Sequence, residues 1–178
     1  MRDPRRVAPT LETVGPLSRQ VDVANIPPQG TAVQVIATEG ECAALARDFK
    51  LPAIRSLVGD YRLSGSAKGI HVAGTVTADI TQVCVVTLDE FDSTITEGVE
   101  VDFAEPRGMP AEPPNEMHDY EPPDEIVNGH IDLGALTAEF LVLGLDPYPR
   151  KPGVDFQFRG DEEADSPFAA LGKLKREV

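Results

Sequence analysis

The feature that most constrains the fold is an alternation of apolar and polar residues over positions 70–81. The apolar or small positions are Ile70, Val72, Gly74, Val76, Ala78 and Ile80. Successive side chains of a β-strand point to opposite faces, so this spacing buries one face and leaves the other in water. A similar alternation runs from Phe91 to Phe103. Residues 61–103 are therefore predicted to form an antiparallel meander with one solvated face.

The flanks of this meander predict further strands and turns. Tyr61 and Leu63 are expected to begin the preceding strand. Residues 83–86, Val-Cys-Val-Val, are apolar at consecutive positions, which predicts either a doubly covered strand or a β-bulge. Earlier in the chain, short strands are expected within 17–26 and 31–37, because turn-forming prolines and a glycine separate them.

Two segments have the apolar spacing of helices. The first is 39–50, whose apolar face consists of Cys42, Leu45, Ala46 and Phe49. The second is 132–145, which begins with the good N-cap Asp132 and ends before Pro147 and Pro149. Together these elements predict an α+β fold. Its antiparallel β-sheet, either open or curled into an incomplete barrel, is covered by the two helices.

The chain is expected to contain one folded domain with tails. We predict a flexible N-terminal arm over 1–16, a single α+β domain over 17–152, and a polar linker with a short C-terminal helix over 153–178. Within the domain, residues 104–129 hold six prolines and seven acidic residues. Such a segment has too little apolar surface to offset the entropy of ordering, so a mobile acidic loop is expected there.

Charge is distributed unevenly and limits the classes of partner. The net charge is −14, and residues 73–178 carry 23 Asp and Glu against seven Lys and Arg. This balance disfavours general binding to nucleic acid phosphates and fits a basic protein partner, although the acid could equally serve solubility alone. No apolar stretch approaches the roughly 20 residues that span a membrane. The arginine-rich start has no apolar run after it, so a cytoplasmic protein is predicted.

Candidate catalytic groups are sparse. The three histidines, His71, His118 and His130, have no partner at metal-ligand spacing. Cys42 and Cys84 are too few for a zinc site or a disulfide framework, so reduced buried thiols are expected. Glu139 is the one carboxylate beside a helix's apolar face, and a structural role for it is favoured over a catalytic one. We therefore expect no enzyme, no cofactor and no metal.

One small basic group stands out near the second helix. Tyr148, Arg150 and Lys151 follow one another in a turn stiffened by prolines, which places an aromatic ring and two cations within reach of RNA backbone or an acidic surface. The alternative is structural: Tyr148 would pack on the core and Arg150 would bond the carbonyls at the helix end. Further cations, Lys173, Lys175 and Arg176, end the predicted C-terminal helix.

Several segments, in order, resemble the YceD family of large ribosomal RNA subunit accumulation proteins, in its alphaproteobacterial form. They are 81–88 (TQVCVVTL), 99–103 (VEVDF), 131–134 (IDLG), 148–153 (YPRKPG) and 166–171 (SPFAAL). The family-motif residues with expected structural roles are Cys84, Asp132, Leu133, Glu139, Pro147 and Pro149. Many members have a second cysteine where this chain has Thr87, so a metal or redox role for that pair is not expected.

The resemblance implies a non-enzymatic ribosome-assembly factor that promotes accumulation or processing of 23S ribosomal RNA. We hypothesise that the acidic half binds a large-subunit ribosomal protein or assembly factor. The cations at Arg150, Lys151, Lys173, Lys175 and Arg176, with Tyr148, would reach precursor 23S RNA. Two alternatives stay open: an RNA-processing enzyme of the same pathway, and a dedicated chaperone of one basic ribosomal protein.

Overall fold

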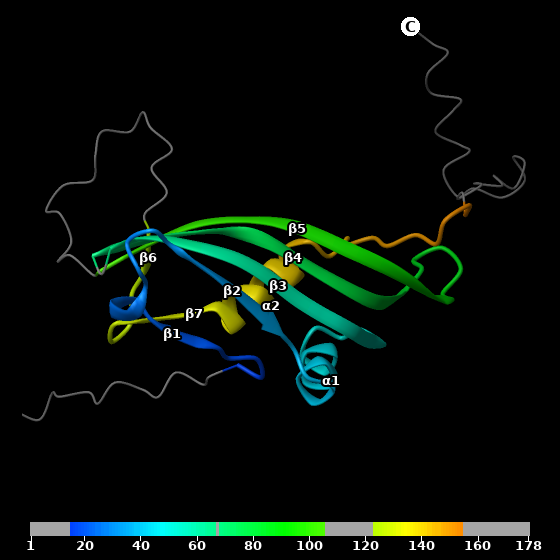
Figure 1. Ribbon diagram of the computed structural model, residues 1–178. Helices are drawn as coiled ribbons and strands as arrows, with labels where there is room; N and C mark the ends of the chain where they lie inside the picture. The colour runs from blue at the N-terminus through cyan, green and yellow to red at the C-terminus, as the bar shows by residue number, and fades with distance from the viewer. Residues whose placement is uncertain (1–14, 67, 106–122, 155–178) are drawn as a thin grey trace, which may run out of the picture.

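The computed structural model describes residues 15–66, 68–105 and 123–154. Its main element is a five-stranded sheet in the order β2-β3-β4-β5-β6. The strands are β2 (Thr31–Ile36), β3 (Ala53–Ser66), β4 (Gly69–Val83), β5 (Glu90–Ala104) and β6 (Asp124–Glu125). Neighbours pair antiparallel except β5 and β6, which are parallel. Figure 1 shows the three long strands bending together into an arch.

The two faces of the sheet follow the alternation in the sequence. Ile70, Val72, Val76, Ala78 and Ile80 of β4 are all buried and form the centre of the core. The intervening Thr75, Thr77 and Asp79 are exposed. The predicted meander with one solvated face is therefore confirmed.

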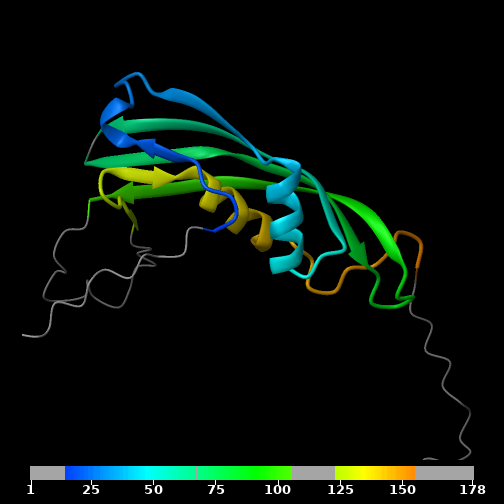
Figure 2. The same cartoon turned by 90° about the horizontal axis from the view of Figure 1, so that it is seen from below.

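The second layer lies on the concave side of the arch. It contains α1 (Glu39–Asp48), α2 (Leu133–Leu143) and a small sheet of β1 (Gln20–Asp22) and β7 (His130–Asp132), with a 3-10 turn, η1 (Val23–Asn25), after β1. Figure 2 shows both helices and the small sheet on this side, and the convex face has no helix over it. The α+β class is confirmed, and the sheet stays open without closing into a barrel.

Two local expectations about strands were wrong. β3 begins at Ala53, well before Tyr61, because a register shift between Ile54 and Ser56 breaks the alternation that would have revealed it. Residues 84–87 form neither a doubly covered strand nor a bulge, because β4 ends at Val83. The chain turns there instead, and the Leu88 N–H donates to the Cys84 carbonyl at 2.9 Å.

The start of α2 is fixed by Asp132 as predicted. Its Oδ1 accepts from the backbone N–H groups of Gly134 at 2.9 Å, Ala135 at 3.1 Å and Arg19 at 2.7 Å, and Oδ2 accepts from the Ser18 hydroxyl. Burial alone would raise the pKa of Asp132, but these hydrogen bonds lower it on balance. One carboxylate thus caps the helix and anchors the segment that leads into β1.

Other expectations lie partly or wholly outside the described residues. Of the predicted loop over 104–129, the described part includes β6 and the buried Ile126, whereas 106–122 lies outside. The predicted arm at 1–14 and the linker and helix from 155 onward also lie outside. In the described ranges, no helix is long and apolar enough to cross a membrane.

Candidate docking surfaces

The predicted aromatic-basic turn lies beside the loop between β4 and β5. The Val85 N–H donates to the Pro149 carbonyl at 2.9 Å, and Asp146 accepts from the Tyr148 N–H at 2.8 Å. These bonds hold the turn on the end of the sheet. Tyr148 is 72% exposed, so it does not pack on the core as the structural alternative required.

The cations of this turn are directed to solvent. Arg150 and Lys151 are exposed, and within the described residues neither side chain forms an ion pair or a hydrogen bond with helix-end carbonyls. Tyr148, Arg150 and Lys151 therefore share one accessible turn, which we call the basic turn. The predicted cations Lys173, Lys175 and Arg176 lie outside the described residues.

Cys84 connects the β4–β5 loop with the basic turn. Its side chain is buried. The Lys151 backbone N–H makes the largest contribution to lowering the pKa of the thiol to about 7, and hydrogen bonds from the Thr87 hydroxyl and backbone add to it. Burial acts in the opposite direction and raises the pKa. Cys42 is also buried, and burial raises the pKa of its thiol. Both cysteines are free, which confirms the expectation of reduced buried thiols.

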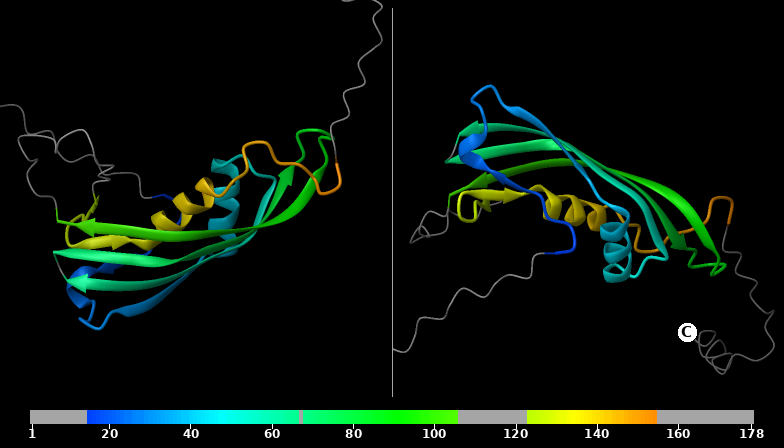
Figure 3. Two further views of the ribbon diagram at one scale, coloured as in Figure 1. Left: turned by 90° about the horizontal axis from the view of Figure 1, so that it is seen from above. Right: turned by 60° about the horizontal axis from the view of Figure 1, so that its bottom comes forward.

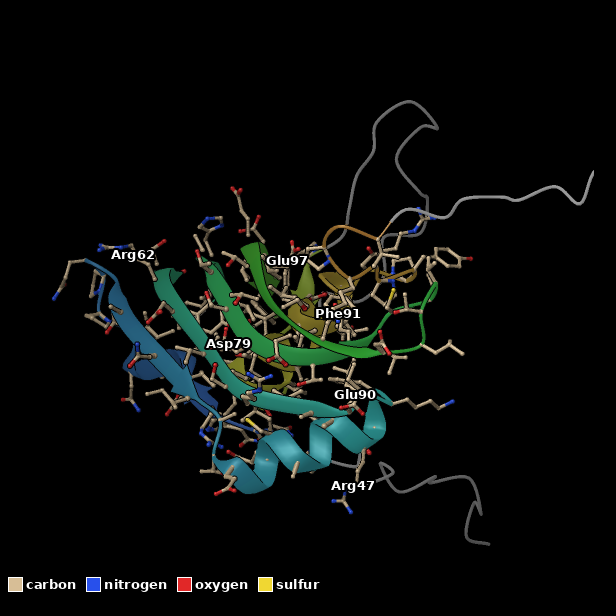
Figure 4. All side chains as sticks on the ribbon, turned by 90° about the vertical axis from the view of Figure 1, so that its right-hand side faces the viewer. Arg47, Arg62, Asp79, Glu90, Phe91 and Glu97 are labelled. Carbon is tan, nitrogen blue, oxygen red and sulfur yellow. The ribbon has the colours of Figure 1, made fainter. Side chains whose placement is uncertain are left out.

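The convex face of the sheet is a broad acidic surface. Its carboxylates come from three neighbouring strands: Asp60, Asp79, Glu90, Asp92, Glu100 and Asp102. Figure 4 labels Arg62 on β3, Asp79 on β4 and Glu90 on β5. Arg55 pairs with Asp92, so part of the negative charge on this face is neutralised.

Hydroxyl groups keep the convex carboxylates in place. Thr94 and Ser56 donate to Asp79 at 2.7 and 2.8 Å, and these hydrogen bonds lower the pKa of that carboxyl. His71 Nδ1 lies 2.8 Å from Asp102 across the β4–β5 ladder. The face thus carries carboxylates that neighbouring side chains hold in place.

A groove that the sequence did not reveal runs between β5 and α2. Its residues on β5 are the consecutive Glu100, Val101 and Asp102. From α2 come Leu136, Glu139, Phe140 and Leu143, which share one helical face, and Asp124 of β6 closes one end. This acidic groove has a volume of about 400 Å³ and contains no Lys or Arg.

The family-motif residues lie at different depths in the structure. Leu133 is fully buried, and Pro147 and Pro149 shape the basic turn. Glu139 is exposed and lines the acidic groove, with no described hydrogen bond. Among the residues that the structure describes, no group of His, Cys, Asp and Glu side chains could hold a metal ion.

One comparison with known proteins identifies a family. The family model described as "Large ribosomal RNA subunit accumulation protein YceD" matches residues 72–175, which is more than half of the chain. That range includes β4 from Val72 onward, β5, α2 and the basic turn. No curated protein matches the chain, and no solved structure does.

Proposed function

The chain belongs to the YceD family, and on this premise we propose that it is a non-enzymatic, cytoplasmic ribosome-assembly factor. It would promote accumulation or processing of 23S ribosomal RNA by binding a ribosomal protein or assembly factor, precursor RNA, or both. The observation that carries the proposal is the family match, because it includes the acidic strand β5, most of β4 and the basic turn.

The charges of the two surfaces support a binding role. The convex face presents ordered carboxylates without a covering helix, which is suited to a partner rich in Lys and Arg. The basic turn presents Tyr148, Arg150 and Lys151 at the end of the same sheet, where a ring and two cations can contact an RNA strand. One molecule would then contact protein and RNA at two separate places.

The proposal is tested by deleting the gene and complementing the deletion with tagged wild-type protein. We expect the deletion to lower the ratio of 23S to 16S RNA and the tagged protein to sediment with precursors of the large subunit. Mature 70S ribosomes serve as the control fraction and should contain little of it. A deletion strain with a normal RNA ratio and normal precursors would contradict the proposal.

A dedicated chaperone of one basic protein is the second candidate, because the convex face carries six carboxylates and the basic turn only two cations. It predicts that the tagged protein binds its partner before ribosome assembly and leaves no crosslink on RNA. An RNA-processing enzyme would instead cleave precursor RNA when purified, and that result would replace both proposals.

A further inference from the structure

The outer edge of β5 is open over most of its length. β5 pairs with β4 along one edge, but in the described part of the chain its other edge pairs only at Phe103 and Ala104, with β6. Apart from the short pairing with β6, no described backbone group bonds to that edge from Glu90 to Val101. Unpaired N–H and C=O groups on an edge strand are a template for one more strand.

The acidic groove lies directly beside this open edge. Consecutive residues of a strand point to opposite faces, so a hollow that Glu100, Val101 and Asp102 line together must face the main-chain edge. α2 forms the other wall with Phe140 and Leu143, and Leu143 is 68% exposed. Figure 3 shows β5 on the side of the sheet away from β2, and only the two-residue β6 lies beyond it.

The charges of the groove indicate its occupant. Glu100, Asp102, Asp124 and Glu139 contribute four carboxylates to the lining, and only Asp102 has a partner in the described residues, His71. Such a lining repels phosphates and attracts cations. A second copy of this chain would place its own acidic edge against this one, and the like charges would repel. Residues 106–122 of the chain carry four acidic residues against one arginine, so their charge does not complement the groove either.

We propose that the β5 edge and the acidic groove bind an extended basic segment of a partner protein, which adds a strand to the sheet beside residues 94–101. This inference rests on the function proposed above, because it assumes that a protein partner takes part in assembly. Side chains of the added strand alternate between the two faces. Those on the convex side meet Glu100 and Asp102, and those on the other side meet Val101, Phe140 and Leu143.

This arrangement specifies the sequence of the partner. Lys or Arg should occupy every second position and apolar residues the positions between them. Eight such residues span about 27 Å, which matches the length of strand available. The apolar positions and main-chain bonds would supply affinity, and the cations would set the register.

The test uses the full chain and a labelled peptide of about ten residues with alternating Lys and Val, followed by fluorescence anisotropy. Two control peptides have the same composition: one places all Lys before all Val, and one is N-methylated at two adjacent central residues. We expect both controls to bind about tenfold more weakly, since they lose the alternation or the main-chain bonds. Equal binding of the N-methylated peptide would overturn the proposal.

Matched variants of the protein locate the site. Glu100→Lys reverses one exposed charge on β5 in the groove, on the side where the cations of the added strand lie, and Asp48→Lys reverses one exposed charge on α1. We expect the first to weaken peptide binding about tenfold and the second less than about twofold. An equal loss of peptide affinity in the two variants would show that the peptide responds only to the net charge of the protein, and this would overturn the proposal. Displacement of the peptide by an RNA oligonucleotide, or a dimer that dissociates on peptide binding, would also overturn it.

Complementation separates this inference from the proposed function. If Glu100→Lys abolishes peptide binding but restores 23S RNA in the deletion strain, the groove is not the partner site and the assembly function stands. If the deletion itself leaves 23S RNA normal, the assembly function fails whatever the peptide does. Circular dichroism of each variant against wild type verifies that folding is intact.

Discussion

The Tyr61 hydroxyl donates to Thr137 Oγ1 at 2.7 Å, and this buried bond joins β3 to α2. Its direction follows from a second bond, because Thr137 Oγ1 lies 2.6 Å from the Leu133 carbonyl and must use its only hydrogen there. Neither side chain has access to water. The helix that forms one wall of the acidic groove is therefore held on the sheet by a specific polar contact as well as by apolar packing.

This contact predicts unequal effects of two conservative substitutions. Thr137→Val leaves the buried Tyr61 donor unsatisfied, so it should lower the free energy of unfolding by about 2 kcal/mol, whereas Tyr61→Phe should lower it by about 1 kcal/mol. Urea denaturation measures both. The double variant should lose less than the sum of the two, and strictly additive losses would show that the hydroxyls do not interact.

Gly134 should tolerate no larger residue, although it lies inside a helix. A Cβ at this position would lie 2.6 Å from the Arg19 backbone nitrogen and 2.7 Å from the Ser18 carbonyl carbon. Gly134→Ala should therefore lower the free energy of unfolding by about 2 kcal/mol, despite the better helix propensity of alanine.

The matched control for this variant is Gly40→Ala in α1, where nothing lies within 4 Å of the added carbon. That change should raise the free energy of unfolding by about 0.5 kcal/mol. Urea denaturation of the two variants in parallel compares them. Stabilisation by Gly134→Ala would mean that the segment at 18–19 does not pack against α2.

Glu41 should make stability depend on acid pH. Hydrogen bonds from Arg19 and then from Thr38 lower the pKa of this carboxyl to about 2. Because the folded-state pKa lies below the unfolded value of 4.5, the stabilisation is complete above pH 4.5 and is lost as the pH falls toward 2.

The variant Glu41→Gln isolates this contribution. At pH 7 it should unfold about 1 kcal/mol more easily than wild type, since it loses the ion pair and part of the capping box. Near pH 2 the difference should disappear. A difference in unfolding free energy that is the same at both pH values would contradict the role assigned to the carboxylate.

Cys84 should titrate near neutral pH although it is buried. The Lys151 N–H and the Thr87 donors favour its thiolate and lower its pKa to about 7, whereas burial raises the pKa of Cys42. In the Cys42→Ala variant, thiolate absorbance should rise through about pH 7, and in the Cys84→Ala variant only at higher pH. The contribution of Cys84 to the free energy of unfolding should increase as the pH rises, because the pKa of this thiol is lower in the folded state than in the unfolded state. Thiolate absorbance unchanged near pH 7 would contradict this.

The sequence predicted the layers of the fold better than its binding surfaces. The alternation in β4 and β5 and the cap at Asp132 are each contained in one continuous segment of sequence. Such local patterns predict the structure correctly when local preference and the burial of one face agree. The start of β3 was missed because a register shift hides the alternation near Ile54. The acidic groove was missed because it depends on tertiary contacts: residues 100–102 and the exposed face of α2 are brought together only by packing.

The basic turn was found from the sequence because its residues are consecutive. Tyr148, Arg150 and Lys151 were predicted together, and the structure leaves all three exposed. What the sequence left open was whether Tyr148 packs inward. Its outward position depends on the backbone bond between Val85 and Pro149, a contact between segments far apart in the chain.

The basic turn supplies the last prediction, which concerns RNA. Arg150→Glu together with Lys151→Glu should weaken crosslinking of the protein to precursor 23S RNA by about tenfold and leave binding of the basic peptide unchanged, because the acidic groove retains all its carboxylates. The matched control is Lys68→Glu with Arg62→Glu, two exposed cations toward the β3–β4 turn and away from the basic turn, which should change crosslinking by less than about twofold. Crosslinking yields from immunoprecipitated protein, compared at equal salt, measure this effect.

Equal losses in the two double variants would mean that RNA responds to total charge. Unchanged crosslinking in the first would remove the basic turn from RNA binding and favour a chaperone that contacts protein alone.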